Sequence, residues 1–178
     1  FKVSLKEALL NRNWDVVTLQ QASMLSHDYS TYEPYLQKLA EYVRLCVPNA
    51  KIVIHQTWAY EQGGELLQRA GYSDYKAMLC NIKKAYETGA GKINADMIIP
   101  SGELFDAMLQ NGIEKVHRDT FHASYGLGRY ALGLLWYSFL TGKSIENISF
   151  NDFDEEITDE QLKIAKRCVL KLVNEYGV

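Results

Sequence analysis

The sequence has no Cys-x-x-Cys pair, no hydrophobic run long enough for a membrane span and no excess of positive charge. Its cysteines are Cys46, Cys80 and Cys168, so the spacing excludes a zinc ribbon and a dithiol redox motif. Each cysteine lies in an amphipathic helical pattern, which predicts a small buried side chain. The absence of 18 consecutive apolar residues excludes a transmembrane helix. The net charge is -3, whereas a nucleic-acid-binding protein usually carries an excess of basic residues.

The composition is that of an ordinary globular domain. The 178 residues are 47% hydrophobic and 23% charged, which suits one domain with a sizeable core. We therefore expect residues 1–178 to form a single domain. The chain begins at Phe1 without a methionine and shows no signal peptide, so we expect it to be cut from a longer protein.

Short β-branched apolar runs alternate with amphipathic helical patterns along the chain. The runs predict strands at 14–20, 51–58 and 95–100, and the patterns predict helices at 5–10, 31–47, 73–88, 102–111, 124–141 and 158–176. This alternation predicts an α/β fold, a three-layer α/β/α arrangement with a parallel, flavodoxin-like sheet. Three strands are few for so many helices, so we expect further N-terminal strands outside this chain.

The segment Asp119-Thr-Phe-His122 stands directly before a strongly apolar helical pattern. A carboxylate that accepts from one imidazole nitrogen fixes the tautomer, and the other nitrogen can then act as a general base. The same spacing also suits an Asp helix cap followed by a histidine. A metal site of His117, Asp119, His122 and His55 would have no standard zinc spacing, so we expect no metal and no cofactor.

Polar residues follow the first two predicted strands, at the sheet edge where α/β proteins gather their functional groups. Gln20, Gln21 and Ala22 follow the first, and their N–H groups are of the type that forms oxyanion holes. They could equally satisfy the backbone of the adjoining loop. The second strand ends in His55-Gln-Thr-Trp58-Ala-Tyr60, which could line a substrate pocket or form a packed aromatic patch.

Three segments in this order, WDVVTLQQAS, PNAKIVIHQTWAY and DTFHASYGLGRYALGLLWYSFLTG, resemble the SGNH, or GDSL-like, hydrolases. The resemblance extends from Phe1 to about Gly142 and is closest to a bacterial branch of the Bacteroidetes type. It implies that Asp119 and His122 are the acid and base of a serine hydrolase. It also implies that Gln21, with Gln20 second and Ala22 beside them, belongs to the oxyanion element.

The chain departs from the family pattern at two points. The Asn of the usual Gly-x-Asn-Asp element is absent at Gln21-Ala22, and no Gly-Asp-Ser or Gly-Asn-Ser nucleophile motif occurs in the 178 residues. We therefore expect the nucleophilic serine to lie upstream of Phe1 and this chain to be inactive alone. Relatives of this kind are commonly exported, so we expect a periplasmic or secreted protein.

The resemblance, together with the aromatic content, implies a serine esterase or deacetylase that acts on acyl, especially acetyl, esters of carbohydrates. His55, Trp58 and Tyr60 would then contact the substrate. The expected partner is a small-molecule or carbohydrate ester, with no nucleic acid. The alternative is a non-catalytic carbohydrate-binding or interaction module on a degenerate hydrolase fold.

Overall fold

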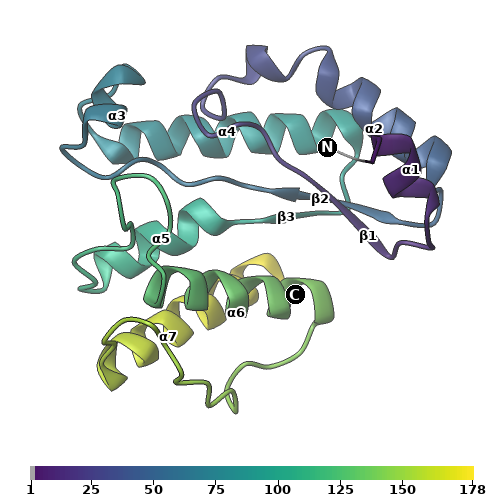
Figure 1. The fold of residues 1–178 in the computed structure, drawn as a ribbon. Helices are drawn as coiled ribbons and strands as arrows, with labels where there is room; N and C mark the ends of the chain where they lie inside the picture. The colour runs from purple at the N-terminus through teal and green to yellow at the C-terminus, as the bar shows by residue number, and fades with distance from the viewer. Residues whose placement is uncertain (1–2) are drawn as a thin grey trace. The chain divides into compact units, whose positions relative to one another are not determined.

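Local capping signals set the starts of the first and last helices in the computed structural model, which describes residues 3–178 (Figure 1). Helix α1, Leu5–Leu10, begins with a capping box in which Ser4 and Glu7 satisfy each other's backbone N–H groups. Helix α7, Asp159–Tyr176, begins with the same arrangement of Thr158 and Gln161. Both predicted starts are confirmed. Phe1, the first residue of the predicted domain, lies outside the described residues.

The three predicted strands form one parallel sheet. They are β1, Val16–Leu19, β2, Lys51–His55, and β3, Met97–Ile99, in the order β1-β2-β3. The register between β1 and β2 runs from Val16 opposite Lys51 to Leu19 opposite Ile54. With helices between the strands, this sheet confirms the α/β class.

The two paired strands differ in burial. Residues 52–54 of β2 are all buried, as expected for a strand covered on both faces. In β1, however, Thr18 is exposed and Val16 and Val17 are only half-buried. The reason is that β1 is the outer strand in the order β1-β2-β3, so it lacks one flanking strand within the described sheet.

Several boundaries differ from the predicted ones. The helix expected at 31–47 is a 3-10 turn, Tyr29–Tyr32, followed by α2, Tyr35–Cys46. The segment between β2 and α4 contains a short helix, α3, Glu65–Arg69. Helix α4 extends over Tyr75–Ile93. Among the described helices, none is both long and apolar enough to cross a lipid bilayer.

The prediction that all three cysteines are buried is wrong for Cys80. Cys168 is buried and Cys46 is half-buried, but Cys80 is exposed. The buried positions of α4 are 78, 79, 82, 85, 86, 89 and 93. Residue 80 falls on the opposite side of the helix at 3.6 residues per turn, so its side chain faces away from the core.

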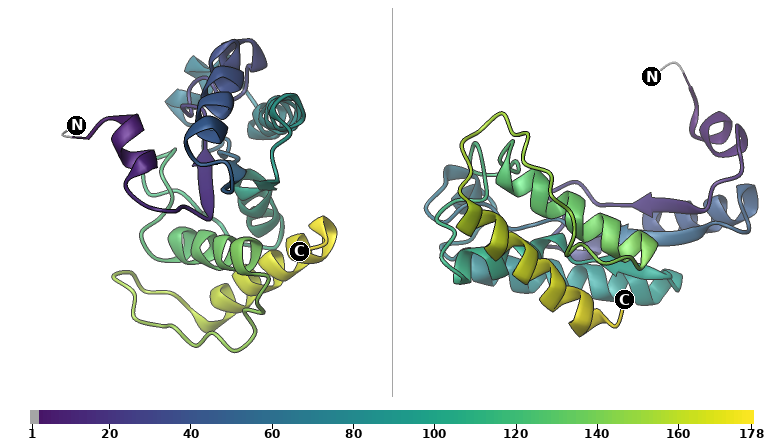
Figure 2. Two further views of the ribbon diagram at one scale, coloured as in Figure 1. Left: turned by 90° about the vertical axis from the view of Figure 1, so that its right-hand side faces the viewer. Right: turned by 90° about the horizontal axis from the view of Figure 1, so that it is seen from below.

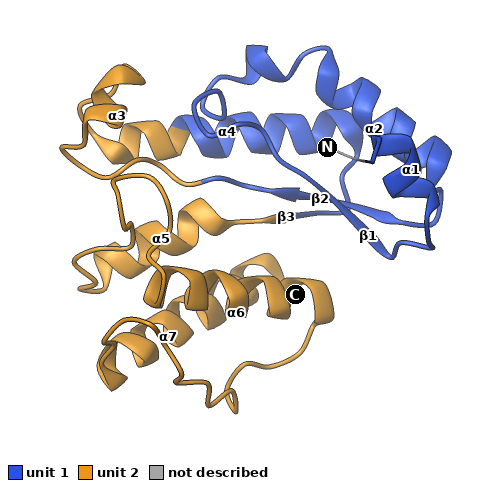
Figure 3. Ribbon diagram, viewed as in Figure 1, with its two compact units in different colours: residues 1–57, 81–98 blue, residues 58–80, 99–178 orange. Residues whose placement is uncertain are grey.

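The chain divides into two compact units (Figure 3). The first comprises Phe1–Thr57 and Asn81–Ile98, and the second comprises Trp58–Cys80 and Ile99–Val178. The core of the first unit contains Val43 of α2, Ile52 and Ile54 of β2, and Ile82 and Tyr86 of α4, all buried. Tyr86 also accepts a hydrogen bond from the backbone N–H of Gln21, just after β1.

The core of the second unit forms between three helices. Helices α5, Ser101–Gln110, and α6, Leu127–Thr141, pack against each other and against α7. The right-hand view of Figure 2 shows α6 and α7 side by side. Gly128 allows α6 to approach the preceding loop closely, because a Cβ there would lie 2.8 Å from the backbone oxygen of Val116.

Two glycines of α6 offer a matched test of this packing. Gly128→Ala should lower the free energy of unfolding by about 1–3 kcal/mol, because the backbone of Val116 would have to move. Gly133→Ala should raise it by about 0.5–1 kcal/mol, since no atom lies within 4 Å of the added methyl group and alanine favours the helix. Denaturant titration of both variants measures these changes. Equal effects at the two positions would contradict the close approach at Gly128.

Candidate active site

The Asp119–His122 segment forms the tip of a tight loop in the second unit. His117 and Ala123 form an antiparallel bridge at its base, and the backbone N–H of Arg118 donates to the carbonyl of His122 at 2.9 Å. Thr120 has a φ of 72°, in the left-handed region that a β-branched residue seldom adopts. The two ends of the D-x-x-H motif are therefore brought together by a strained turn.

The segment after β2 supports this turn. The N–H of Glu61 donates to the carbonyl oxygen of Thr120 at 2.8 Å. A Cβ at Gly64 would lie 3.3 Å from the Cβ of Thr120 and 3.0 Å from the backbone oxygen of Glu61. The lack of a side chain at Gly64 thus leaves room for the turn and helps to fix its unusual backbone conformation.

The turn places the carboxylate of Asp119 against the imidazole of His122. Nδ1 of the ring lies 2.8 Å from Oδ2 and 3.1 Å from Oδ1, and the His122 backbone N–H donates to Oδ1 at 2.9 Å. The hydrogen bond from the His122 ring holds the pKa of Asp119 well below its usual range. An ionised carboxylate only accepts hydrogen bonds, so Nδ1 must carry the proton. The lone pair of a neutral His122 ring is then on Nε2.

Both side chains of the pair remain accessible. Asp119 is 45% exposed and His122 is 48% exposed, so solvent and small molecules can reach them. Nε of Arg118 lies 3.3 Å from Oδ2 of Asp119. The guanidinium groups of Arg118 and Arg129 also stack on the ring of Tyr125, 4.5 and 4.6 Å from its centroid. The accessible pair is thus flanked by positive charge.

Aromatic residues hold the ring of His122 in place. The ring of Phe121 lies 3.7 Å from that of His122, centroid to centroid. The Nε1–H of Trp58 donates to the carbonyl oxygen of Phe121 at 2.6 Å, and Tyr60 meets the Phe121 ring edge-on at 6.2 Å. Trp58 and Tyr60, which the sequence assigns to substrate contact, therefore lie against the Asp119–His122 loop. Tyr60 is buried and Trp58 is half-buried.

In the first unit, His55 and Gln20 meet at the carboxyl ends of β2 and β1. Nδ1 of His55 lies 2.6 Å from Oε1 of Gln20. Burial lowers the pKa of His55 to about 4, so the ring is neutral at pH 7. An amide oxygen can only accept, so the Nδ1–H of His55 donates to it. This bond fixes the orientation of the Gln20 carboxamide.

The amide groups of Gln21 and Ala22, in the loop that follows β1, form hydrogen bonds within the protein. Nε2 of Gln21 donates to the carbonyl oxygen and hydroxyl of Thr31, at 3.1 and 3.2 Å. Its Oε1 accepts from the N–H of Ala22 at 2.8 Å, and its own N–H donates to Tyr86. The donors predicted at Gln21 and Ala22 thus have partners in this loop and at Tyr86 of α4.

Sequence patterns did not reveal Glu155, which lies near the base of the Asp119–His122 loop. Its carboxylate accepts from the N–H groups of Tyr125 and Gly126, at 3.2 and 2.8 Å, just before α6. Helix α6 has no side-chain cap of its own, so this carboxylate stabilises its positive end. Glu155 is about 30 residues distant along the chain, and a local motif does not extend that far.

Within residues 3–178, no three His, Cys, Asp or Glu side chains gather closely enough to hold a metal ion.

Comparisons with known proteins place the chain among bacterial relatives. It is similar to the crystal structure of a DUF4886 family protein from Bacteroides uniformis ATCC 8492, with 26% identity and a TM-score of 0.85. The match covers 98% of this chain and 67% of that one. No curated protein matches the sequence significantly.

A second solved structure shares the fold. It is a protein from Slackia heliotrinireducens described as "a putative SGNH hydrolase", with 24% identity and a TM-score of 0.61. The match covers 75% of this chain and 69% of that one. This likeness supports the assignment of the α/β fold.

The family model for DUF4886, a domain of unknown function, matches residues 1–171. That match extends over nearly the whole length, and the chain therefore belongs to the DUF4886 family.

Proposed function

We propose that this chain carries the acid–base pair of an SGNH-type serine esterase or deacetylase. The observation that carries this proposal is the contact of Asp119 with Nδ1 of His122, which makes Nε2 the proton acceptor of the neutral ring. An accessible imidazole in this tautomer is what a serine hydrolase needs in its general base. The fold shared with the Slackia protein described as "a putative SGNH hydrolase" is consistent with that chemistry.

The proposed reaction has two stages. His122 Nε2 takes the proton of a serine hydroxyl while the serine oxygen attacks the acyl carbonyl carbon. The tetrahedral intermediate collapses, and the imidazolium returns the proton to the departing alkoxide. Water then attacks the acyl-enzyme while His122 takes its proton. The imidazolium returns that proton to the serine oxygen, and the carboxylic acid is released. Asp119 stays ionised throughout and stabilises the imidazolium, consistent with its lowered pKa.

We propose that the nucleophilic serine lies in a part of the protein outside these 178 residues. No Gly-Asp-Ser or Gly-Asn-Ser motif occurs in the sequence. The match with the Bacteroides uniformis structure covers 98% of this chain and 67% of that one, so that chain includes segments that have no counterpart here.

Gln20 is our preferred side-chain donor for the oxyanion. The bond from His55 occupies the oxygen of its carboxamide and orients the group, while the two N–H hydrogens of that amide take no part in this bond. Gln21, which the resemblance favours, uses its N–H groups on Thr31. A preorganised donor of this kind contributes about 3 kcal/mol to transition-state stabilisation in comparable sites.

The proposed substrate is an acetyl ester of a carbohydrate. Its support is the resemblance to SGNH hydrolases together with the aromatic residues Trp58 and Tyr60 beside the His122 loop. Trp58 is half-buried, so a ligand can reach part of this residue. We propose export to the periplasm or cell exterior for the same enzyme, since that resemblance favours an exported branch.

One observation favours the alternative of a non-catalytic carbohydrate-binding module. The N–H groups of Gln21 and Ala22, at the position of the family's oxyanion element, donate to partners in their own loop and to Tyr86 of α4. A degenerate site would keep such donors occupied. Saturable sugar binding by a full-length protein without esterase activity would favour this alternative.

The acid–base pair predicts a steep loss of activity on substitution. In the full-length protein, with p-nitrophenyl acetate as substrate, His122→Ala should lower kcat by about 10³-fold or more, and Asp119→Asn by about 10²- to 10⁴-fold. The control is Asp152→Asn, an exposed carboxyl in the loop before α7, which should leave kcat unchanged. A drop below tenfold for His122→Ala would mean that the pair is structural.

Substitutions of Gln20 and Gln21 should have different effects, one on the catalytic rate and the other on stability. Gln20→Glu keeps an acceptor for His55 but removes the N–H donors, so kcat should fall about 10²- to 10³-fold with little change in melting temperature. Gln21→Ala removes the bonds to Thr31 and Ala22, so the free energy of unfolding should fall by about 1–3 kcal/mol. Kinetics and thermal melts of both variants measure this, and the reverse pattern would place the donor at Gln21.

A further inference from the structure

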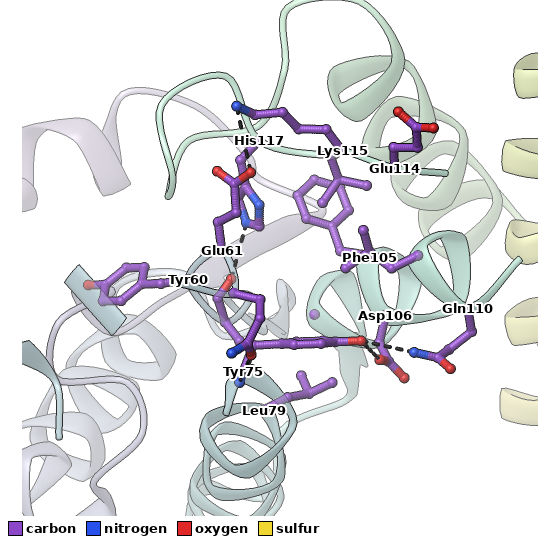
Figure 4. A pocket seen from close by; sticks show the side chains of 15 residues that line it. Tyr60, Glu61, Tyr75, Leu79, Phe105, Asp106, Gln110, Glu114, Lys115 and His117 are labelled. Carbon is purple, nitrogen blue, oxygen red and sulfur yellow. Dashed lines mark hydrogen bonds and ion pairs between the residues drawn. The ribbon is translucent and has the colours of Figure 1, made fainter. Parts of the chain in front are cut away.

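A pocket of about 250 Å³ opens in the second unit (Figure 4). Its walls come from four segments, namely residues 59–62 after β2, the start of α4, helix α5 and residues 114–117. Asp119 and His122 are not among the residues that line it. Apart from Tyr60, the pocket is therefore built from side chains that the proposed hydrolytic reaction does not use.

One wall of the pocket is apolar and rigid. Phe105 of α5 is buried, and its ring packs against Trp58 at 4.9 Å and edge-on against His117 at 5.8 Å, centroid to centroid. Leu79 of α4 is also buried and lies beside Tyr75 in Figure 4. These side chains provide a preformed surface for a short hydrocarbon chain.

Glu61 presents a carboxylate oxygen without a protein partner. Its Oε2 atom is buried and has no hydrogen-bond partner within residues 3–178. Its other oxygen lies 3.6 Å from Nζ of Lys115, a side chain that is 52% exposed. A buried, unpaired carboxylate oxygen is costly, and such groups in native proteins generally meet a donor. The backbone N–H of Glu61 is held by Thr120, which fixes the point from which the side chain extends.

A second acidic group lies across the same pocket. The hydroxyl of Tyr75 donates to Oδ1 of Asp106 and accepts from Nε2 of Gln110, both at 2.9 Å. Burial, together with the bond to Asp106, raises the pKa of Tyr75 to about 12, so the phenol stays protonated. The carboxylate of Asp106 keeps further acceptor capacity because its two oxygens offer about four lone-pair positions.

The charge of the lining favours a cation. Glu61, Asp106 and Glu114 contribute three negative charges, and Lys115 contributes one positive charge, which leaves a net charge of -2. Burial lowers the pKa of His117, and its Nε2–H donates to the carbonyl oxygen of Ala59 at 3.1 Å. A neutral His117 therefore does not offset this negative charge.

We propose that this pocket binds a small organic ammonium compound. The ammonium N–H groups donate to Oε2 of Glu61, and the hydrocarbon part packs on Phe105 and Leu79. A cation also gains from the faces of aromatic rings such as those of Phe105 and Tyr75. A neutral polyol would satisfy the donor requirement but would leave the charge of -2 uncompensated. The site is independent of the proposed esterase, and its test requires no turnover.

The probe is 1,4-diaminobutane, with 1,4-butanediol and succinate as neutral and anionic counterparts of equal chain length. Isothermal titration calorimetry of the full-length protein is done in 0.15 M NaCl, which screens attraction at the surface. It should show saturable binding of the diamine and no binding of the diol or of succinate. Glu61→Gln keeps the shape of the side chain and should weaken binding about tenfold or more, because it removes the charge that the ammonium meets. Asp106→Asn should also weaken it.

Two further variants separate this pocket from general attraction to an acidic protein. Lys115→Gln removes the competing cation beside Glu61, so the diamine should bind about threefold or more tightly. Glu160→Gln, an exposed carboxyl on α7, should leave the affinity unchanged. Circular dichroism confirms that each variant is folded. Equal binding of the diol, preferred binding of succinate, absence of diamine binding, or unaltered affinity in Glu61→Gln would each overturn the proposal.

Discussion

The contact between the Asp119 carboxylate and Nδ1 of His122 is the interaction on which the proposed chemistry depends. Its geometry comes from the backbone, because Thr120 takes a left-handed conformation and the bridge between His117 and Ala123 closes the loop. The segment after β2 holds that turn through Glu61, Gly64 and Trp58. A change at Gly64 or Trp58 would move the imidazole without touching it, whereas Glu61 supports the turn through its backbone N–H group.

Features set by neighbouring residues could be predicted from the sequence. The capping boxes at Ser4 and Thr158 need partners only three residues away, so they marked the starts of α1 and α7. The apolar run Ile52–Ile54 likewise identified a strand. The pairing of Asp119 with His122 is local in the same sense, and this explains why a four-residue motif was enough to suggest it.

Features set by distant contacts could not be predicted in this way. The side chain of Gln21 is occupied by Thr31, and Glu155 supports the start of α6 from about 30 residues away. Likewise, Glu61 is an ordinary acidic residue in the sequence, yet residues from α4, α5 and the loop after α5 enclose a pocket around it. Glu61 also joins the two proposals, since its backbone supports the Asp119–His122 turn while its side chain lines the pocket.

The tautomer of His122 is the most direct test of the central claim, and it does not depend on finding the nucleophile. Long-range ¹H–¹⁵N correlation spectra of the imidazole rings distinguish Nδ1–H from Nε2–H, and the spectrum of His122→Gln assigns the signal. At a pH where the ring is neutral, the contact with ionised Asp119 predicts the Nδ1–H form, which should be lost in Asp119→Asn. A predominantly Nε2–H ring in the unaltered protein would contradict the account.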